Sequence, residues 1–195
     1  LSATRLTISV LSAVEAVLIP IMLQFSGLNR TDSFALYGIT TGIVLPFILF
    51  PGTITNSLSV LLLPEVSKAY YEKDNRKIMR TTQITIKYSL LLGCIAMAVF
   101  VCFGSQIGNL FFHNARSGKL LSLLSMICPF VYVSTTLASI INGLSKSSIT
   151  FRNTVIGLIL RITFLIAATP YFGIYGYLLG LLVSQILISI LDGYY

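Results

Sequence analysis

The fold is decided by residues 37–63, YGITTGIVLPFILFPGTITNSLSVLLL, an apolar stretch without a charged residue. At about 1.5 Å of rise per residue, a helix over this range would be about 40 Å long, whereas the hydrocarbon core of a bilayer is about 30 Å thick. Pro46 and Pro51 each remove a backbone hydrogen bond, and Gly52 follows directly. We therefore predict a membrane helix that is tilted or broken in its middle.

A polar-rich run follows this point, and Asn56 lies in it among threonines and serines. Irregular backbone at membrane depth is tolerated only where its free carbonyl groups meet protein or line a water-filled cavity. We therefore predict that Pro46, Pro51 and Gly52 form a helix break or gate and that Asn56 faces a polar cavity. Simple accommodation of helix packing is the alternative interpretation.

The composition of the whole chain is that of a membrane protein. Apolar residues make up 55% of the 195 residues, charged residues make up 10%, and the mean hydropathy is +0.90. A soluble domain carries about 25% charged residues, so most of this surface is expected to meet hydrocarbon. Because backbone groups in lipid must be satisfied within their own segment, we predict an all-α integral membrane protein, a bundle of six transmembrane helices. The predicted spans are 5–25, 37–63, 88–112, 120–143, 153–169 and 174–191.

The basic residues determine the predicted orientation. Many of the 13 lysines and arginines lie in the range 64–87, which we interpret as a basic cytoplasmic loop. The other basic residues on the side of this loop would be Arg5, Lys146 and Arg152. Those on the opposite side would be Arg30, Arg116 and Lys119. This bias predicts a multi-pass membrane protein with both ends of the segment in the cytoplasm, and since topology explains the net charge of +7 we expect no nucleic-acid partner.

Two residues of opposite charge are predicted at similar depth in the membrane. Glu15 falls near the middle of the first span, on one stripe with Arg5, and Arg161 falls near the middle of the fifth. An unpaired charge at mid-bilayer costs about 2.5–3.5 kcal/mol even on insertion scales, so we expect Glu15 and Arg161 to pair or to face one hydrated cavity. A structural bridge and a substrate or ion contact are both open. The candidate cavity or substrate residues are Arg5, Glu15, Asn56 and Arg161.

Motifs for enzymatic or cofactor chemistry are missing from the sequence. Cys94, Cys102 and Cys128 lie in apolar runs without metal-ligand spacing, and His113 is the only histidine. Neither a P-loop nor an HExxH motif is present. We therefore expect no catalytic residue, no metal site, no cofactor and no enzymatic activity.

Short motifs along nearly the whole chain carry a resemblance to one group of transporters. They are Tyr37-Gly38 through Gly42, Leu45-Pro46, Phe50-Pro51, Asn56-Ser57-Leu58-Ser59, Leu63-Pro64-Glu65-Val66-Ser67, Cys128-Pro129-Phe130, Ser134-Thr135-Thr136 with Asn142-Gly143-Leu144, and Phe172-Gly173-Ile174-Tyr175-Gly176-Tyr177. In order and spacing they resemble the second half of stage V sporulation protein B-like proteins. These belong to the polysaccharide-transport branch of the multidrug/oligosaccharidyl-lipid/polysaccharide (MOP) superfamily, to which MATE-type exporters are related.

The resemblance implies two six-helix lobes that alternate between inward- and outward-open states around a central cavity. This chain would be the C-terminal lobe of such a MATE/MOP-type transporter, with the missing N-terminal lobe of the same protein as its partner, and the missing initiator Met agrees with a fragment. The implied activity is that of a flippase for a lipid-linked sugar of the undecaprenyl-pyrophosphate type, used in cell-wall or spore-cortex synthesis. Relatives usually place several cationic residues in the cavity, whereas here Arg5 and Arg161 are the candidates for binding pyrophosphate.

Two other functions fit the same residues. A cation-coupled multidrug exporter of the same superfamily would use Glu15 as its proton or sodium site. A non-transporting membrane scaffold would tolerate the simultaneous neutralisation of Glu15 and Arg161.

Overall fold

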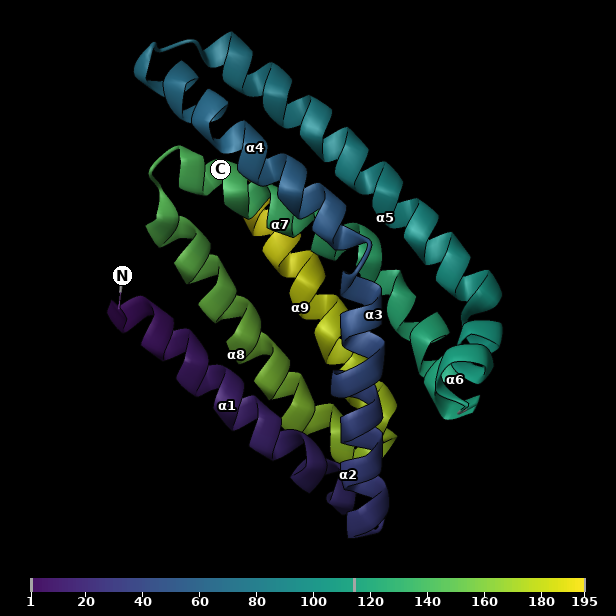
Figure 1. The fold of residues 1–195 in the computed structure, drawn as a ribbon. Coiled ribbons are helices and arrows are strands. Elements are labelled where there is room, and N and C mark those ends of the chain that lie inside the picture. The colour runs from purple at the N-terminus through teal and green to yellow at the C-terminus, as the bar shows by residue number, and fades with distance from the viewer. Residues whose placement is uncertain (1, 114, 195) are drawn as a thin grey trace.

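The computed structural model describes residues 2–113 and 115–194, and in these ranges it consists of helices joined by short connections (Figure 1). The helices are α1 (Ser2–Phe25), α2 (Arg30–Ile39), α3 (Leu45–Leu49), α4 (Gly52–Tyr71), α5 (Asn75–Phe112), α6 (Ala115–Leu124), α7 (Cys128–Gly143), α8 (Ser147–Phe172) and α9 (Ile174–Tyr194). A π-helical segment, Thr40–Val44, joins α2 to α3, and a 3-10 turn, Ser125–Ile127, joins α6 to α7.

In the described part of the chain, 6 helical stretches are long and apolar enough to cross a membrane. They are Thr4–Phe25, Arg30–Leu49, Asn75–Phe112, Arg116–Gly143, Ser147–Phe172 and Ile174–Tyr194. The predicted all-α class and the six-span bundle are therefore confirmed.

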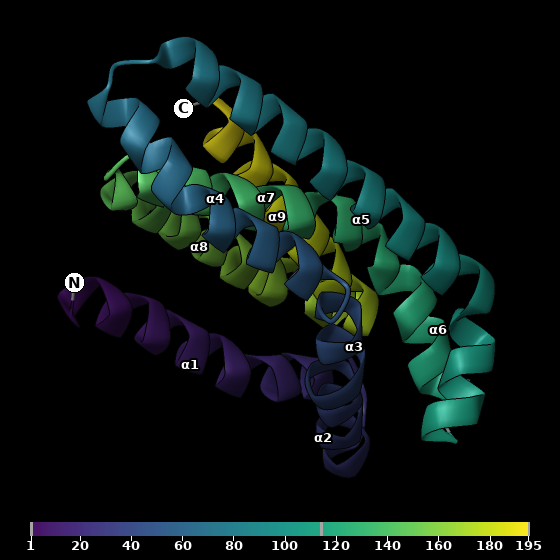
Figure 2. The ribbon, with the colours of Figure 1, turned by 45° about the horizontal axis from the view of Figure 1, so that its top comes forward.

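Helices α7 and α9 lie between two outer pairs, α1 with α8 on one side and α4 with α5 on the other (Figures 1 and 2). Both chain ends and the α4–α5 and α7–α8 connections lie at one end of the bundle, whereas the α1–α2, α5–α6 and α8–α9 connections lie at the opposite end (Figure 1). This is the arrangement expected when each hydrophobic stretch crosses the membrane once.

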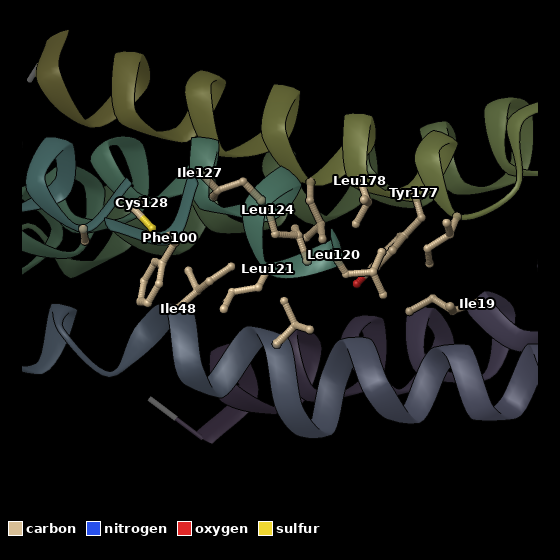
Figure 3. Packing of buried hydrophobic residues seen from close by; sticks show 14 of the residues in the cluster. Ile19, Ile48, Phe100, Leu120, Leu121, Leu124, Ile127, Cys128, Tyr177 and Leu178 are labelled. Atoms are coloured by element: carbon tan, nitrogen blue, oxygen red, sulfur yellow. The ribbon is translucent and has the colours of Figure 1, made fainter. Parts of the chain in front are cut away.

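The core is built from side chains that converge on α6 and α9. Figure 3 shows Ile48, Leu121, Leu124 and Tyr177 in this cluster, all of them buried. Helices approach closely where glycines face a neighbour: a Cβ added to Gly93 of α5 would lie 2.5 Å from the Cα atom of Pro129 in α7. Large apolar side chains also cover the outside, as expected of a surface in contact with lipid.

The second span differs from the single interrupted helix predicted over 37–63. It begins at Arg30, widens into the π-helical segment before Pro46, stops at Leu49 and continues as α4 from Gly52. Proline has no N–H for the carbonyl of the residue four positions earlier, and its ring crowds that carbonyl. The wide π-helical turn just before Pro46 accommodates both effects.

The structure differs from the predicted loop over 64–87, because this range is helical except at 72–74. The charged residues end the apolar run but not the helices. Asp74 caps α5 by accepting a 3.0 Å hydrogen bond from the Lys77 backbone nitrogen, and Nζ of Lys77 lies 3.2 Å from Oε1 of Glu65 on α4. With 38 residues α5 is about 57 Å long, so one end of it extends beyond the hydrocarbon into water.

The other predicted spans also lengthen or divide. The structure gives 2–25 in place of 5–25, 75–112 in place of 88–112, 147–172 in place of 153–169 and 174–194 in place of 174–191. The predicted span 120–143 comprises α6, the 3-10 turn and α7.

Candidate functional site

The first group of candidate residues lies where α1 packs on α8. Oε2 of Glu15 accepts a hydrogen bond from Nη2 of Arg161, so the two side chains form an ion pair between helices that are far apart in sequence. Glu15 is only 4% exposed, whereas the side chain of Arg161 is 24% exposed and reaches the surface. Pairing offsets the cost of holding either charge alone at membrane depth.

The ion pair is only partly satisfied. Oε1 of Glu15 and Nε of Arg161 are buried and form no hydrogen bond of ordinary geometry with the described residues. Tyr177 of α9 is 3% exposed and lies close enough to interact electrostatically with Glu15, Arg161 and Tyr37. In Figure 3 its ring extends from α9 across the core. The Tyr177 hydroxyl is therefore placed to share the remaining hydrogen-bonding capacity of Glu15, whereas Nε of Arg161 keeps a donor for a ligand or water.

The second group lies at the break between α3 and α4. The hydroxyl of Tyr132 on α7 donates a 2.6 Å hydrogen bond to the carbonyl oxygen of Ile48, and the backbone of Gly52 hydrogen-bonds to the same hydroxyl. In an uninterrupted helix the N–H of Gly52 would donate directly to Ile48. The Tyr132 hydroxyl thus occupies the place of the missing helical hydrogen bond, which is a recognised cause of sharp kinks.

The ring of Tyr132 fits closely against the same break. Tyr132 is fully buried, and a Cβ added to Gly52 would lie 2.7 Å and 2.9 Å from two of its ring carbons. Only a residue without a side chain leaves room for the ring at this distance. The break is therefore held by a side chain from a neighbouring helix as well as by the prolines.

A pocket opens beside the break, between α4 and α7. Its volume is about 240 Å³, and Thr53 and Asn56 of α4 and Thr135 of α7 contribute polar groups to its wall. All three residues are exposed; Thr135 lies in the apolar stretch Arg116–Gly143, whereas Thr53 and Asn56 lie at the start of α4, which continues the second span beyond Leu49. The remaining lining residues are Leu49, Gly52, Val131 and Tyr132.

The structure does not bring all the sequence-predicted residues together. Arg5 is exposed and lies ten residues before Glu15 on α1, about 15 Å along the helix axis. Asn56 and Arg161 belong to separate parts of the bundle, the first beside the break and the second beside α1. In ranges 2–113 and 115–194, no group of three or more His, Cys, Asp or Glu side chains is placed to hold a metal ion.

Sequence reasoning missed two tyrosines. Tyr132 and Tyr177 lie inside apolar runs and are not among the candidate residues that the sequence indicates. The signal was their depth, because a tyrosine hydroxyl buried in a membrane helix needs a hydrogen-bonding partner. Asp192 is a similar case: it is 2% exposed on α9, and Asn153 of α8 donates a 2.8 Å hydrogen bond to it.

A polytopic helical bundle with a broken second span and an ion pair between two of its spans is the architecture of a membrane protein and is one that transporters use. The MatE family model matches residues 7–166, and the chain belongs to this family. It is 28% identical over 120 residues to sporulation protein YkvU of Bacillus subtilis (strain 168), an alignment that covers 62% of this chain and 27% of that relative. The chain therefore spans about a quarter of the length of this curated relative. No solved structure shows a significant match.

Proposed function

We propose that this chain is the C-terminal lobe of a two-lobe transporter that flips a lipid-linked oligosaccharide or peptidoglycan precursor by alternating access. The observation that carries the proposal is the exposed polar wall beside the break, formed by Thr53, Asn56 and Thr135. Polar side chains at membrane depth face protein or a wet cavity. A second lobe opposite this wall would enclose such a cavity, and would be the N-terminal half of the same protein.

The charged part of the substrate would meet the arginines. Arg161 is partly exposed and has a buried Nε without a hydrogen-bond partner in the described chain, and Arg5 is exposed on α1. A guanidinium group binds pyrophosphate through paired hydrogen bonds. The B. subtilis relative is a sporulation protein, which favours a role in sporulation.

The break would serve as the gate. Pro46 and Pro51 remove two backbone donors, so few helical hydrogen bonds join the two halves of the span, and a shift of the Tyr132 contact would let them change their angle. Placement in the plasma membrane follows from the proposed substrate, and the basic residues favour an orientation with both ends in the cytoplasm.

A second candidate function is cation-coupled multidrug export by the same fold. It is favoured by one observation: Oε1 of Glu15 is buried and without a hydrogen bond of ordinary geometry, as suits a site for a proton or sodium ion. The two functions differ in their substrates and in their dependence on an ion gradient.

The Arg161→Lys variant tests the leading proposal. Lysine keeps the positive charge opposite Glu15 but lacks the planar fork that binds pyrophosphate. Losing a hydrogen bond to a charged group costs about 1.5–3 kcal/mol, so flipping should fall about 10- to 100-fold. The measurement is translocation of a fluorescent undecaprenyl-pyrophosphate sugar in proteoliposomes that contain the complete two-lobe protein.

Arg76→Lys is the matched control, because Arg76 is exposed at the start of α5, away from the ion pair. It should flip the lipid at the wild-type rate. Unchanged flipping in both Arg161→Lys and Arg5→Lys would contradict the assignment of the arginines. Dye efflux driven by a proton or sodium gradient, without any flipping, would favour the exporter.

A further inference from the structure

We propose that the pocket beside the helix break binds the uncharged, hydroxyl-rich part of the substrate, its sugar, while the charged linkage binds elsewhere. This inference rests on the proposed function and assigns one chemical part of the substrate to one pocket. It follows from which hydrogen-bonding groups of the pocket are already used inside the protein.

The hydroxyl groups of the pocket have no hydrogen left to donate. Thr53 donates to the carbonyl oxygen of Phe50 at 2.7 Å, and Thr135 donates to that of Tyr132 at 3.0 Å. Tyr132 itself donates to Ile48. Since a hydroxyl has one hydrogen and two lone pairs, Thr53 and Thr135 can offer only acceptor lone pairs to a ligand.

Among the described lining side chains, Asn56 is the one that supplies N–H donors, two in number. Its amide carries these donors and one acceptor oxygen, and the residue is exposed on the same wall. In this arrangement the wall favours a ligand that donates several hydrogen bonds and accepts one or two. Sugar hydroxyl groups do both, since each can donate and accept.

The absence of charged side chains from the described lining makes the pocket a poor site for the pyrophosphate linkage. A phosphate oxygen only accepts hydrogen bonds and is matched by cations, whereas the lining contains no lysine or arginine. A cationic amine would supply donors, but no carboxylate lines the pocket to offset the cost of removing its charge from water. A neutral ligand suits the lining best.

The volume of the pocket and its apolar lining residues also favour a sugar as the ligand. The volume of about 240 Å³ is below the roughly 300–1,000 Å³ of pockets that enclose a drug-sized molecule, so only a part of a large substrate fits. Leu49 and Val131 supply apolar surface for the C–H faces of a sugar ring. Arg161 is not among the lining residues, which agrees with separate contacts for the two parts of the substrate.

The test compares two lipids in proteoliposomes that contain the complete two-lobe protein: undecaprenyl pyrophosphate with a sugar and the same lipid without it. Asn56→Leu keeps the approximate shape of the side chain but removes its polar groups. We expect flipping of the sugar-bearing lipid to fall about tenfold and flipping of the sugar-free lipid to stay unchanged. Thr135→Val, which removes one acceptor, should show the same selectivity and provides a second variant should Asn56→Leu fold poorly.

Ser57→Ala is the matched control, because Ser57 is exposed on α4 but does not line the pocket. Equal losses for the two lipids, or no loss for either, would overturn the inference and leave the proposed function intact. A wild-type protein that moves neither lipid would overturn the proposed function and this inference with it. Export of a protonated amine that falls in Asn56→Leu, with sugar-lipid flipping unaffected, would assign the pocket to a cation instead.

Discussion

The Arg161→Met variant is expected to lose about 3–5 kcal/mol of folding stability, together with transport. Methionine removes the partner of Glu15, which is 4% exposed and would stay buried as an uncompensated charge. Glu15→Gln should cost less, because the partly exposed Arg161 side chain has access to water. Thermal unfolding in detergent micelles measures the first effect, and transport in proteoliposomes measures the second.

An exposed ion pair in the same chain supplies the control. Lys77 and Glu65 lie 3.2 Å apart with side chains 42% and 48% exposed, and pairs of this kind contribute about 0–1 kcal/mol. Lys77→Met should therefore change stability little. Equal effects of Lys77→Met and Arg161→Met would contradict the importance of the buried pair.

Charge reversal separates a structural role from a functional one. The double variant Glu15→Arg/Arg161→Glu retains a pair of opposite charges, so we expect folding to recover. Recovery of transport as well would make the pair purely structural. Recovery of folding alone would mean that at least one of the two residues contacts the substrate.

The number of spans and the proximity of Glu15 to Arg161 are the features that sequence alone could predict, because lipid requires the first and favours the second. Apolar runs of this length have to be helices, and Glu15 and Arg161 at similar depth each lower the cost of the other. The helical range 64–87 escaped prediction for the opposite reason. In water neither helix nor loop is required, and a cap such as Asp74 is visible only as a weak local signal.

The role of Tyr132 could not be predicted, because it depends on tertiary contact. Its partner Ile48 is 84 residues away in sequence, and nothing local to either residue indicates the bond. Pro46, Pro51 and Gly52 predicted a break, but the geometry of that break depends on which neighbouring side chain enters it. The same holds for the pocket, whose walls come from α4 and α7.

The second large effect is expected at this break. Tyr132→Phe removes only the hydroxyl, so the Ile48 carbonyl and the Gly52 N–H lose their shared partner inside the bundle. Each unsatisfied backbone group costs about 1–3 kcal/mol, which gives a loss of about 2–6 kcal/mol. Stability against unfolding in detergent and transport activity should both be lower than in the wild type. Tyr171→Phe, at a residue that is 84% exposed, is the control and should behave as wild type.

Gly52, which packs against the ring of Tyr132, provides a second test of this contact. Gly52→Ala would place a Cβ 2.7 Å from the ring of Tyr132, which is fully buried and hydrogen-bonded to Ile48, and overpacking of this kind costs about 1–3 kcal/mol. Gly42 lies in the same broken span, yet nothing is within 4 Å of a Cβ added there, so Gly42→Ala should be neutral or stabilising by up to about 1 kcal/mol. Opposite signs for two identical substitutions would show that contact with Tyr132, rather than glycine flexibility, keeps the span broken. Equal effects would contradict that conclusion.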